Sequence, residues 1–203
     1  VHVEIEALAT DCLSAILKVR SEKFTEEAVN DALIKIAKSV WRQVEVLNRI
    51  PDKMDASLYY KTFRQYIRFF EDVTYEGVDS KPMNYRGETG AQSSIIPLLV
   101  AFMKIPHQPS TLTNHLADMK NFMPSEHVAI LEETTQLSEV KSLSDKNLFN
   151  EVLEGMAAFR EIHYKWAQEY INKWVADPRG TGGTPYMDWL KKLIDETRSH
   201  KIT

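Results

Sequence analysis

Several ingredients are scarce in this chain, and each scarcity excludes a class of protein. It has one cysteine, Cys12, which excludes an internal disulfide and a cysteine-based metal cluster. We therefore expect a reducing, cytoplasmic compartment. The longest apolar run covers only residues 95–103 and contains Pro97, which is too short to cross a bilayer. No signal peptide is visible, so we expect no membrane partner.

An excess of basic charge is also missing. The 25 lysines and arginines are balanced by 29 aspartates and glutamates, giving a formal net charge of −4. Proteins that bind nucleic acid carry a basic excess or a basic stripe, so we expect no nucleic-acid partner. With 203 residues, 43% of them hydrophobic, the chain is long enough to bury a core that could hold a cofactor.

Glycine is scarce as well, with seven residues, about half the average share, and this favours a mostly helical chain. Apolar residues recur at spacings of three and four from the start. Because this pattern is under way at Val1, with no Met before it, we expect upstream sequence to be missing. The spacing and capping residues predict helices over 1–19, 25–50, 55–70, 92–103, 110–122, 125–137, 144–175 and 185–198, with an irregular stretch at 73–91.

Five of the seven glycines fall in two loops, residues 86–94 and 179–184. Such concentration indicates backbone that approaches something closely or moves, although two ordinary helix connections would also explain it. Neither loop matches a phosphate-binding motif, which argues against nucleotide binding. No GxSxG is present either, and Ser93 and Ser94 have no inferable His–Asp partner, which argues against a serine nucleophile.

His163 stands out among the six histidines because it lies on the apolar stripe of the longest predicted helix. An imidazole in an apolar, aromatic wall is the ligand that an iron porphyrin needs. Arg160, one turn earlier, could pair with a porphyrin carboxylate. A hydrogen-bonded core histidine would give the same pattern, and the residues alone leave both interpretations open.

Four segments together resemble the indoleamine 2,3-dioxygenase family, over nearly the whole chain and in the family's order. They correspond to a small-residue loop that ends in Gln-Ser-Ser, a "DM…MPPAH" segment, the helix that carries the proximal heme ligand, and a mobile loop over the substrate. In this sequence they are residues 87–94, 116–127, 160–163 and 180–184.

The resemblance implies an all-α helical bundle that encloses heme b, with the whole of 1–203 as the family's large heme-binding domain. His163 would be the axial iron ligand, and Arg160 would pair with a heme propionate. Thr89 and Gly90 would lie on the distal side, with Thr89 near a propionate. The family's small upstream domain would be missing here, and this chain could associate with it.

The resemblance also places a substrate site. Tyr59, Tyr60 and Arg64 fall on the family's substrate positions, where Arg64 would hold the amino-acid carboxylate. Thr181 and Gly182 would reach the substrate's ammonium group, and Arg64 and Thr181 would be the residues that serve catalysis. Tyr60 and Arg64 are one helical turn apart and share a face, which suits a flat indole that carries a carboxylate. A solvated helix charge is the alternative for Arg64.

Three departures from the family bear on the substrate. Tyr59 and Tyr60 replace a pair of phenylalanines, Val100 replaces an acidic residue, and residues 88–91 read Glu-Thr-Gly-Ala. They resemble the branch that contains the heme enzyme of pyrrolnitrin biosynthesis, which rearranges a tryptophan derivative.

The function implied is a heme-dependent dioxygenase that uses dioxygen to open the indole ring of tryptophan or a related indoleamine, giving an N-formylkynurenine-type product. The alternatives are the rearrangement, an oxygen-binding heme protein without turnover, and a helical interaction domain with no cofactor.

Overall fold

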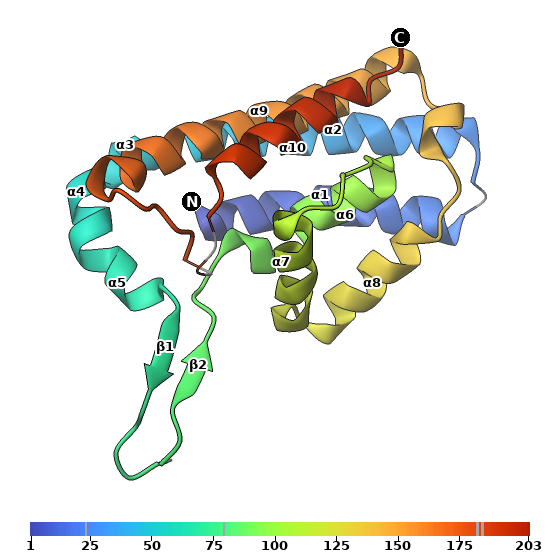
Figure 1. Cartoon of the computed structure of the whole chain (residues 1–203). Helices are drawn as coiled ribbons and strands as arrows, with labels where there is room; N and C mark the ends of the chain where they lie inside the picture. Colours follow the sequence, from blue (N-terminus) through green and yellow to red (C-terminus); the bar gives the residue numbers. More distant parts are fainter. Residues whose placement is uncertain (23, 79, 182, 184) are drawn as a thin grey trace.

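The molecule is built on two long helices that lie side by side. A computed structural model describes residues 1–203 except 23, 79, 182 and 184. Helix α1 (His2–Ser21) packs against α2 (Glu26–Asn48), which begins where the hydroxyl of Thr25 accepts a hydrogen bond from the Ala28 amide. Helix α9 (Lys146–Tyr170) packs on α2, and α10 (Met187–Ser199) packs on α9 (Figure 1).

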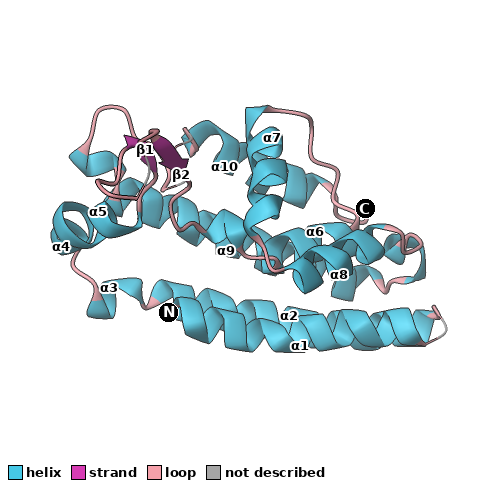
Figure 2. Cartoon of the chain, turned by 90° about the horizontal axis from the view of Figure 1, so that it is seen from below, coloured by secondary structure: helices cyan, strands magenta, loops and turns pink. Residues whose placement is uncertain are grey.

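Three shorter helices complete the body: α6 (Ile95–Met103), α7 (Thr111–Met119) and α8 (Ser125–Thr135). Figure 2 shows α1 and α2 as one layer, with α6, α8 and α9 above it and α7 and α10 beyond. The core lies between α1, α2, α6 and α9, where the largest fully buried side chains include Ile16, Leu33, Ile36, Phe102, Phe149 and Met156. The all-α prediction is confirmed.

At Gly155, α9 lies close against α2. A Cβ at this position would lie 2.9 Å from Cγ1 of Val40, nearer than two carbon atoms can pack. Beside it, the indole N–H of Trp41 donates to the Glu151 carboxylate over 2.6 Å. The glycine therefore allows α9 to lie directly on the helix pair.

The segment after α2 differs from the single helix predicted over 55–70. It consists of α3 (Ile50–Lys53), α4 (Ala56–Leu58), a π-helical turn (Tyr59–Phe63) and α5 (Arg64–Ile67). Asp55 caps α4, as expected, by accepting from the Leu58 amide over 2.9 Å. The π turn widens the helix and rotates the residues after it, and such turns are common at functional sites.

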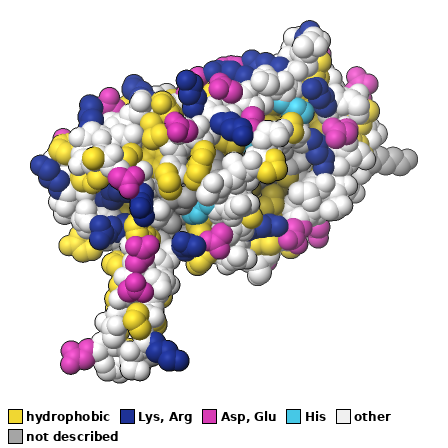
Figure 3. Space-filling model, viewed as in Figure 1, with side chains coloured by type: hydrophobic (Ala, Val, Ile, Leu, Met, Phe, Trp, Pro, Cys, Tyr) yellow, Lys and Arg dark blue, Asp and Glu magenta, His cyan; other side chains and the backbone are white. Residues whose placement is uncertain are grey.

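A β-hairpin begins at the end of the helix predicted over 55–70 and extends into the stretch predicted to be irregular. Strands β1 (Phe70–Val73) and β2 (Met83–Tyr85) pair antiparallel, with a bulge between them. Asp72 takes a φ of 53°, and its amide donates to the Asn84 side chain over 3.0 Å. This side-chain contact joins the two strands at the bulge, and no alternation of apolar residues signals it. The hairpin projects from the body as a narrow arm with charged side chains along it (Figure 3).

The other helix ends lie close to their predicted positions. Asp145 caps α9 by accepting from the amides of Asn147 and Leu148. Helix α10 begins at Met187, two residues after the start predicted for it. Within the described residues, no helix combines the length and apolar character needed to cross a bilayer.

Candidate active site

Arg64 is the first residue of α5 and is buried, with 7% of its surface exposed. Its Nη2 donates to the backbone carbonyl of Arg179, in the second glycine loop. Its Nη1 is buried and, among the described residues, has no hydrogen-bond partner. The structure therefore excludes a solvated helix charge. A buried guanidinium with an unpaired nitrogen is costly unless an anion binds to it, and a carboxylate matches its geometry.

The residues just before Arg64 in the sequence, Tyr59 and Tyr60, contribute to a wall of aromatic rings. The ring of Tyr60 stacks on Trp174, with centroids 6.0 Å apart and planes at 14°. Tyr59 makes an edge contact with Tyr170 of α9, with centroids 5.7 Å apart. The indole nitrogen of Trp174 is buried and has no partner within the described chain. Flat, largely apolar faces with an unused donor suit a planar heteroaromatic ligand that has a polar edge.

Tyr186, which the sequence reasoning missed, also belongs to this site. Burial raises the pKa of its phenol to about 12, while the Arg64 charge acts in the opposite direction. The hydroxyl donates to the side-chain oxygen of Asn172 over 2.8 Å. The phenol is therefore neutral, and it lies near enough to Arg64 for the charge of the guanidinium to act on it. The signal available in the sequence was a tyrosine two residues after the second glycine loop.

The two glycine-rich loops meet at the end of α5. A Cβ on Gly87 would lie 2.2 Å from the carbonyl oxygen of Thr181 and 2.5 Å from that of Ile67, so only glycine fits. The Phe69 amide donates to the Thr181 carbonyl over 2.8 Å. The concentration of glycine thus reflects close backbone approach. Gly182, predicted to contact the substrate's ammonium group, lies outside the described residues.

Thr89 begins a 3-10 turn (Gly90–Gln92) in the first of these loops. Its hydroxyl accepts from the Ala91 amide, and the Gln92 side chain reaches back to the Thr89 amide over 3.3 Å. A Cβ on Gly90 would meet none of the described atoms within 4 Å. The loop thus presents an ordered turn with open space beside Gly90.

His163 lies midway along the carboxyl-terminal half of α9, and its side chain is accessible to solvent. Surrounding protein nonetheless lowers its pKa, and the charge of nearby His2 lowers it further. In the part of the chain that the structure describes, its ring makes no hydrogen bond. A neutral, accessible and unpaired imidazole is what a metal ligand requires, whereas a core histidine would be hydrogen-bonded.

Arg160 lies one turn before His163 and is buried against α10. Its Nη1 donates to the Leu193 carbonyl over 2.9 Å and to the Thr197 hydroxyl, and its Nη2 lies 3.3 Å from Nε2 of His107. Burial lowers its pKa to about 10. His107 is itself held by Glu196, with Nδ1 and Oε2 2.7 Å apart. Both Nη1 protons of Arg160 therefore bind α10. The expected pairing of Arg160 with a heme propionate stays a prediction.

We expect Arg160→Met to loosen α10, because charged hydrogen bonds in a buried site contribute about 1.5–3 kcal/mol each. Amide hydrogen exchange in 187–199 should accelerate by about tenfold or more. Arg198→Met is the matched control, since Arg198 also joins α10 to α9, through Glu154 and Glu161, but at the surface. Equal acceleration in both variants would contradict a special role for the buried guanidinium.

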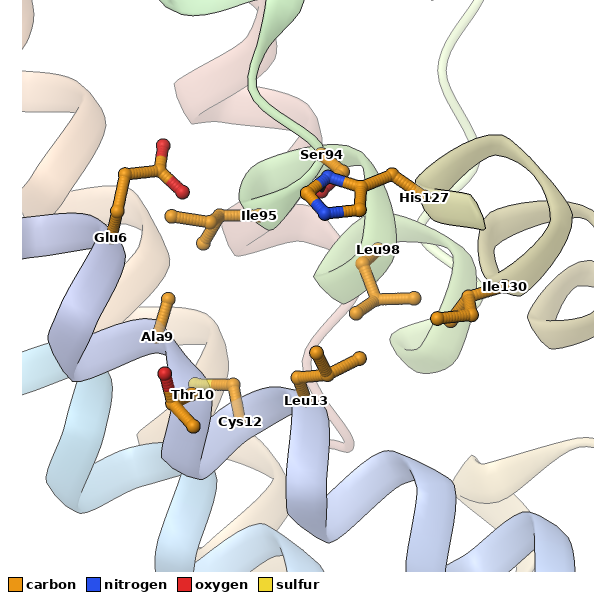
Figure 4. Close-up of a pocket in the computed structure, with 10 residues that line it drawn as sticks. All are labelled: Glu6, Ala9, Thr10, Cys12, Leu13, Ser94, Ile95, Leu98, His127 and Ile130. Atoms are coloured by element: carbon orange, nitrogen blue, oxygen red, sulfur yellow. Dashed lines mark hydrogen bonds between the residues drawn. The ribbon is translucent and has the colours of Figure 1, made fainter. Parts of the chain in front are cut away.

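A shallow pocket of about 180 Å³ lies between α1, α6 and α8 (Figure 4). On its rim, the Ser94 hydroxyl and Nδ1 of His127 are 3.0 Å apart. Among the described residues no carboxylate hydrogen-bonds to His127, so the pair lacks the third member of a hydrolytic triad. Burial raises the pKa of the Cys12 thiol in its floor to about 11, which keeps that thiol protonated and unreactive.

Comparison with known proteins decides the family. The family model described as indoleamine 2,3-dioxygenase matches residues 1–176. The chain belongs to the indoleamine 2,3-dioxygenase family. It is 27% identical to indoleamine 2,3-dioxygenase 1 of Rattus norvegicus, over 98% of this chain and 57% of that protein. It is 26% identical to "Indoleamine 2,3-dioxygenase qulI" of Penicillium citrinum, over 76% of this chain and 42% of that protein.

A further relative is a myoglobin of Haliotis madaka, 26% identical over 74% of this chain and 46% of its own length. The chain spans about half the length of the curated relatives it matches. The fold and the family are therefore established for this part, while activity and substrate concern the whole protein.

The side chains present fit a heme. The described residues contain no cluster of three or more His, Cys, Asp or Glu that could hold a metal ion on its own. A porphyrin brings four nitrogen ligands and needs only one or two more from the protein, of which His163 can supply one. The unpaired nitrogens of Arg64 and Trp174 are further groups that await a ligand.

Proposed function

We propose that this chain is the heme-binding domain, 1–203, of a dioxygenase that opens the indole ring of tryptophan or a related indole amino acid. The single observation that carries the substrate class is the buried, unpartnered Nη1 of Arg64 beside the ring wall of Tyr60 and Trp174. It supports a ligand with both a carboxylate and a flat aromatic ring. Membership of the indoleamine 2,3-dioxygenase family supports the reaction class.

Heme b, when bound through His163, supplies the iron that activates dioxygen, whose two atoms enter an N-formylkynurenine-type product. The work of the chain is placement. Arg64 binds the carboxylate in a two-bond geometry that fixes the orientation of the amino-acid end. Tyr59 and Tyr60 hold the indole, and the loop that carries Thr181 covers the site, orients the ammonium group and excludes water.

Ring contacts and hydrogen bonds connect the elements of the site to one another. Tyr170 lies two turns after His163 on α9 and contacts both Trp166 and Tyr59 through ring edges. Arg64 holds the Arg179 carbonyl, and the Thr181 carbonyl binds the Phe69 amide. Substrate bound at Arg64 would therefore stabilise Arg179 and Thr181 in the positions that they take here.

The myoglobin relative favours a second candidate, an oxygen-binding heme protein without turnover. The two candidates differ in their need for a carboxylate site. A carrier of dioxygen has no use for a buried guanidinium with a free nitrogen, whereas an enzyme that acts on amino acids does. For this reason we favour the dioxygenase.

The experiment is to load the full chain with heme, record its reduced visible spectrum with and without carbon monoxide, and add L-tryptophan. The dioxygenase proposal expects a histidine-ligated heme, a shift on adding tryptophan, and a product heavier by two oxygen atoms. A rearranged product without added oxygen would indicate the reaction of the pyrrolnitrin branch. A heme spectrum that is blind to tryptophan and gives no product would support the oxygen carrier.

A further inference from the structure

A largely buried cluster of charged and polar side chains ties a connecting segment to α9 and α10. The segment, residues 105–110, links α6 to α7 and contains two prolines, which have no amide hydrogen to donate. Two contacts join it to Glu196 of α10. Nδ1 of His107 lies 2.7 Å from Oε2 of Glu196, and the Gln108 amide donates to Oε1 over 3.3 Å. The side chains of His107 and Glu196 are 12% and 14% exposed, so a proton from solvent can still reach them.

The third member of the cluster determines where the imidazole carries its proton. Nη2 of Arg160, on α9, lies 3.3 Å from Nε2 of His107. A guanidinium can only donate, so Nε2 accepts, and the one ring proton of the neutral imidazole lies on Nδ1 and is donated to Glu196. Arg160 is itself held by α10, through the Leu193 carbonyl over 2.9 Å and the Thr197 hydroxyl. His107, Arg160 and Glu196, which we call the His107 joint, thus connect the segment to both helices.

Protonation of His107 is incompatible with this arrangement. A second ring proton has to go to Nε2, where it would point at the N–H groups of Arg160 and place two cations in contact. The Glu196 carboxylate offsets part of this charge, but Lys192 of α10 already lies 3.8 Å from its other oxygen. Burial lowers the pKa of His107, the Arg160 charge lowers it further, and Glu196 acts in the opposite direction. The joint therefore holds a neutral histidine, which can take up a proton only when Nε2 and Arg160 separate.

The helices on the two sides of the joint lead to the two glycine loops. Helix α10 follows the second loop in the chain. Helix α7 follows the segment 105–110 and packs on the turn Gly90–Gln92 of the first loop. Near the end of α7, Oδ2 of Asp118 lies 2.9 Å from Nη2 of Arg86, at the start of that loop. The joint thus connects elements that position both loops of the candidate site.

We infer that the His107 joint is an acid-sensitive connection, which holds the start of α7 to α10 at neutral pH and opens when His107 takes up a proton. In the open form His107 has its ordinary pKa of about 6.5, so the stabilisation is fully present above that pH and is lost as the pH falls below it. Acid would thereby let the two glycine loops move independently of each other. The joint consists of contacts within the chain, so its test does not depend on heme binding or on the proposed function.

The test measures amide hydrogen exchange of the full chain between about pH 7.5 and about pH 5, corrected for the chemical exchange rate at each pH. Protection of α7 and α10 should fall together on acidification, by about fivefold or more, while α2 stays protected. In His107→Gln the protection should not change with pH, because the amide can accept from Arg160 but does not titrate.

His200→Gln is the matched control. Nε2 of His200 lies 2.9 Å from the Met103 carbonyl, so this nitrogen already carries a proton and a second proton, on Nδ1, leaves the contact intact. Burial lowers the pKa of His200 as well, so the two histidines differ chiefly in whether the partner of Nε2 is an acceptor or a donor. His200→Gln should therefore lose protection on acidification as the unmodified chain does.

Protection that is unchanged down to about pH 5, or that falls equally in His107→Gln, would overturn the acid-sensitive joint. Loss of protection in α2 at the same pH would do so too, because it would mean that the whole chain unfolds. If His107→Gln is already unprotected at neutral pH, proton NMR of the unmodified chain decides. The ring signal that is absent from His107→Gln should titrate with the same midpoint as the loss of protection, and different midpoints would contradict the proposal.

Discussion

Replacing His163 with glycine should abolish heme retention, leaving a folded helical chain without a Soret band. His163 is the one histidine on the apolar stripe of α9, its imidazole is accessible, and the surrounding protein lowers its pKa and so favours the neutral form. An iron–imidazole bond is the strongest single contact that such a site offers, and removing it leaves only dispersion and carboxylate contacts to the porphyrin. The measurement is heme content per chain after reconstitution and desalting, with circular dichroism to confirm the fold.

Two further samples make that result specific. Added imidazole should return heme to His163→Gly, because the free ligand fits the space left by the side chain. His127→Ala should bind heme normally, since His127 pairs with Ser94 at the rim of a separate pocket. Full heme retention by His163→Gly without imidazole would show that another residue is the ligand.

Replacing Arg64 with alanine should lower kcat/KM for L-tryptophan by about 100-fold, roughly 2.7 kcal/mol of transition-state binding. The lost contact is a charged, buried interaction with the carboxylate, made by a nitrogen that has no partner among the described residues. Heme content should not change. Arg64→Lys should recover only part of the loss, because an ammonium group cannot form the two parallel bonds of the guanidinium.

Tryptamine, which lacks the carboxylate, separates substrate binding from loop support. If Arg64 binds the carboxylate, activity with tryptamine should be low in the unmodified chain and nearly unchanged in Arg64→Ala. Arg64 also holds the Arg179 carbonyl, so a purely structural role would lower activity with both substrates equally. Arg68→Ala, on an exposed arginine four residues later, is the control and should leave both activities intact.

Much of the helical framework was predictable, because it depends on local spacing. The periodic apolar residues of α2 and α9, and their caps at Thr25 and Asp145, specify each helix within its own segment. The failures occurred where local pattern is weak. The π turn at Tyr59–Phe63 and the hairpin of β1 and β2 are short irregularities, and their apolar spacing resembles a helix in the first case and a loop in the second.

The residues of the candidate site were likewise predictable only in part. The sequence, with its family resemblance, was enough to single out His163, Arg64 and the two glycine loops. It did not reveal that Tyr186 lies near Arg64, nor that Arg160 donates to the Thr197 hydroxyl.

By itself, then, the sequence determined most of the helices, the residue types available for chemistry and the family. The tertiary structure alone decided which of these residues meet. Arg64 and the Arg179 carbonyl are 115 residues apart, and Arg160 and Thr197 are 37 apart. The physical reason is that burial and pairing of charged groups depend on contacts between distant segments, whereas helix formation depends on neighbours within one or two turns.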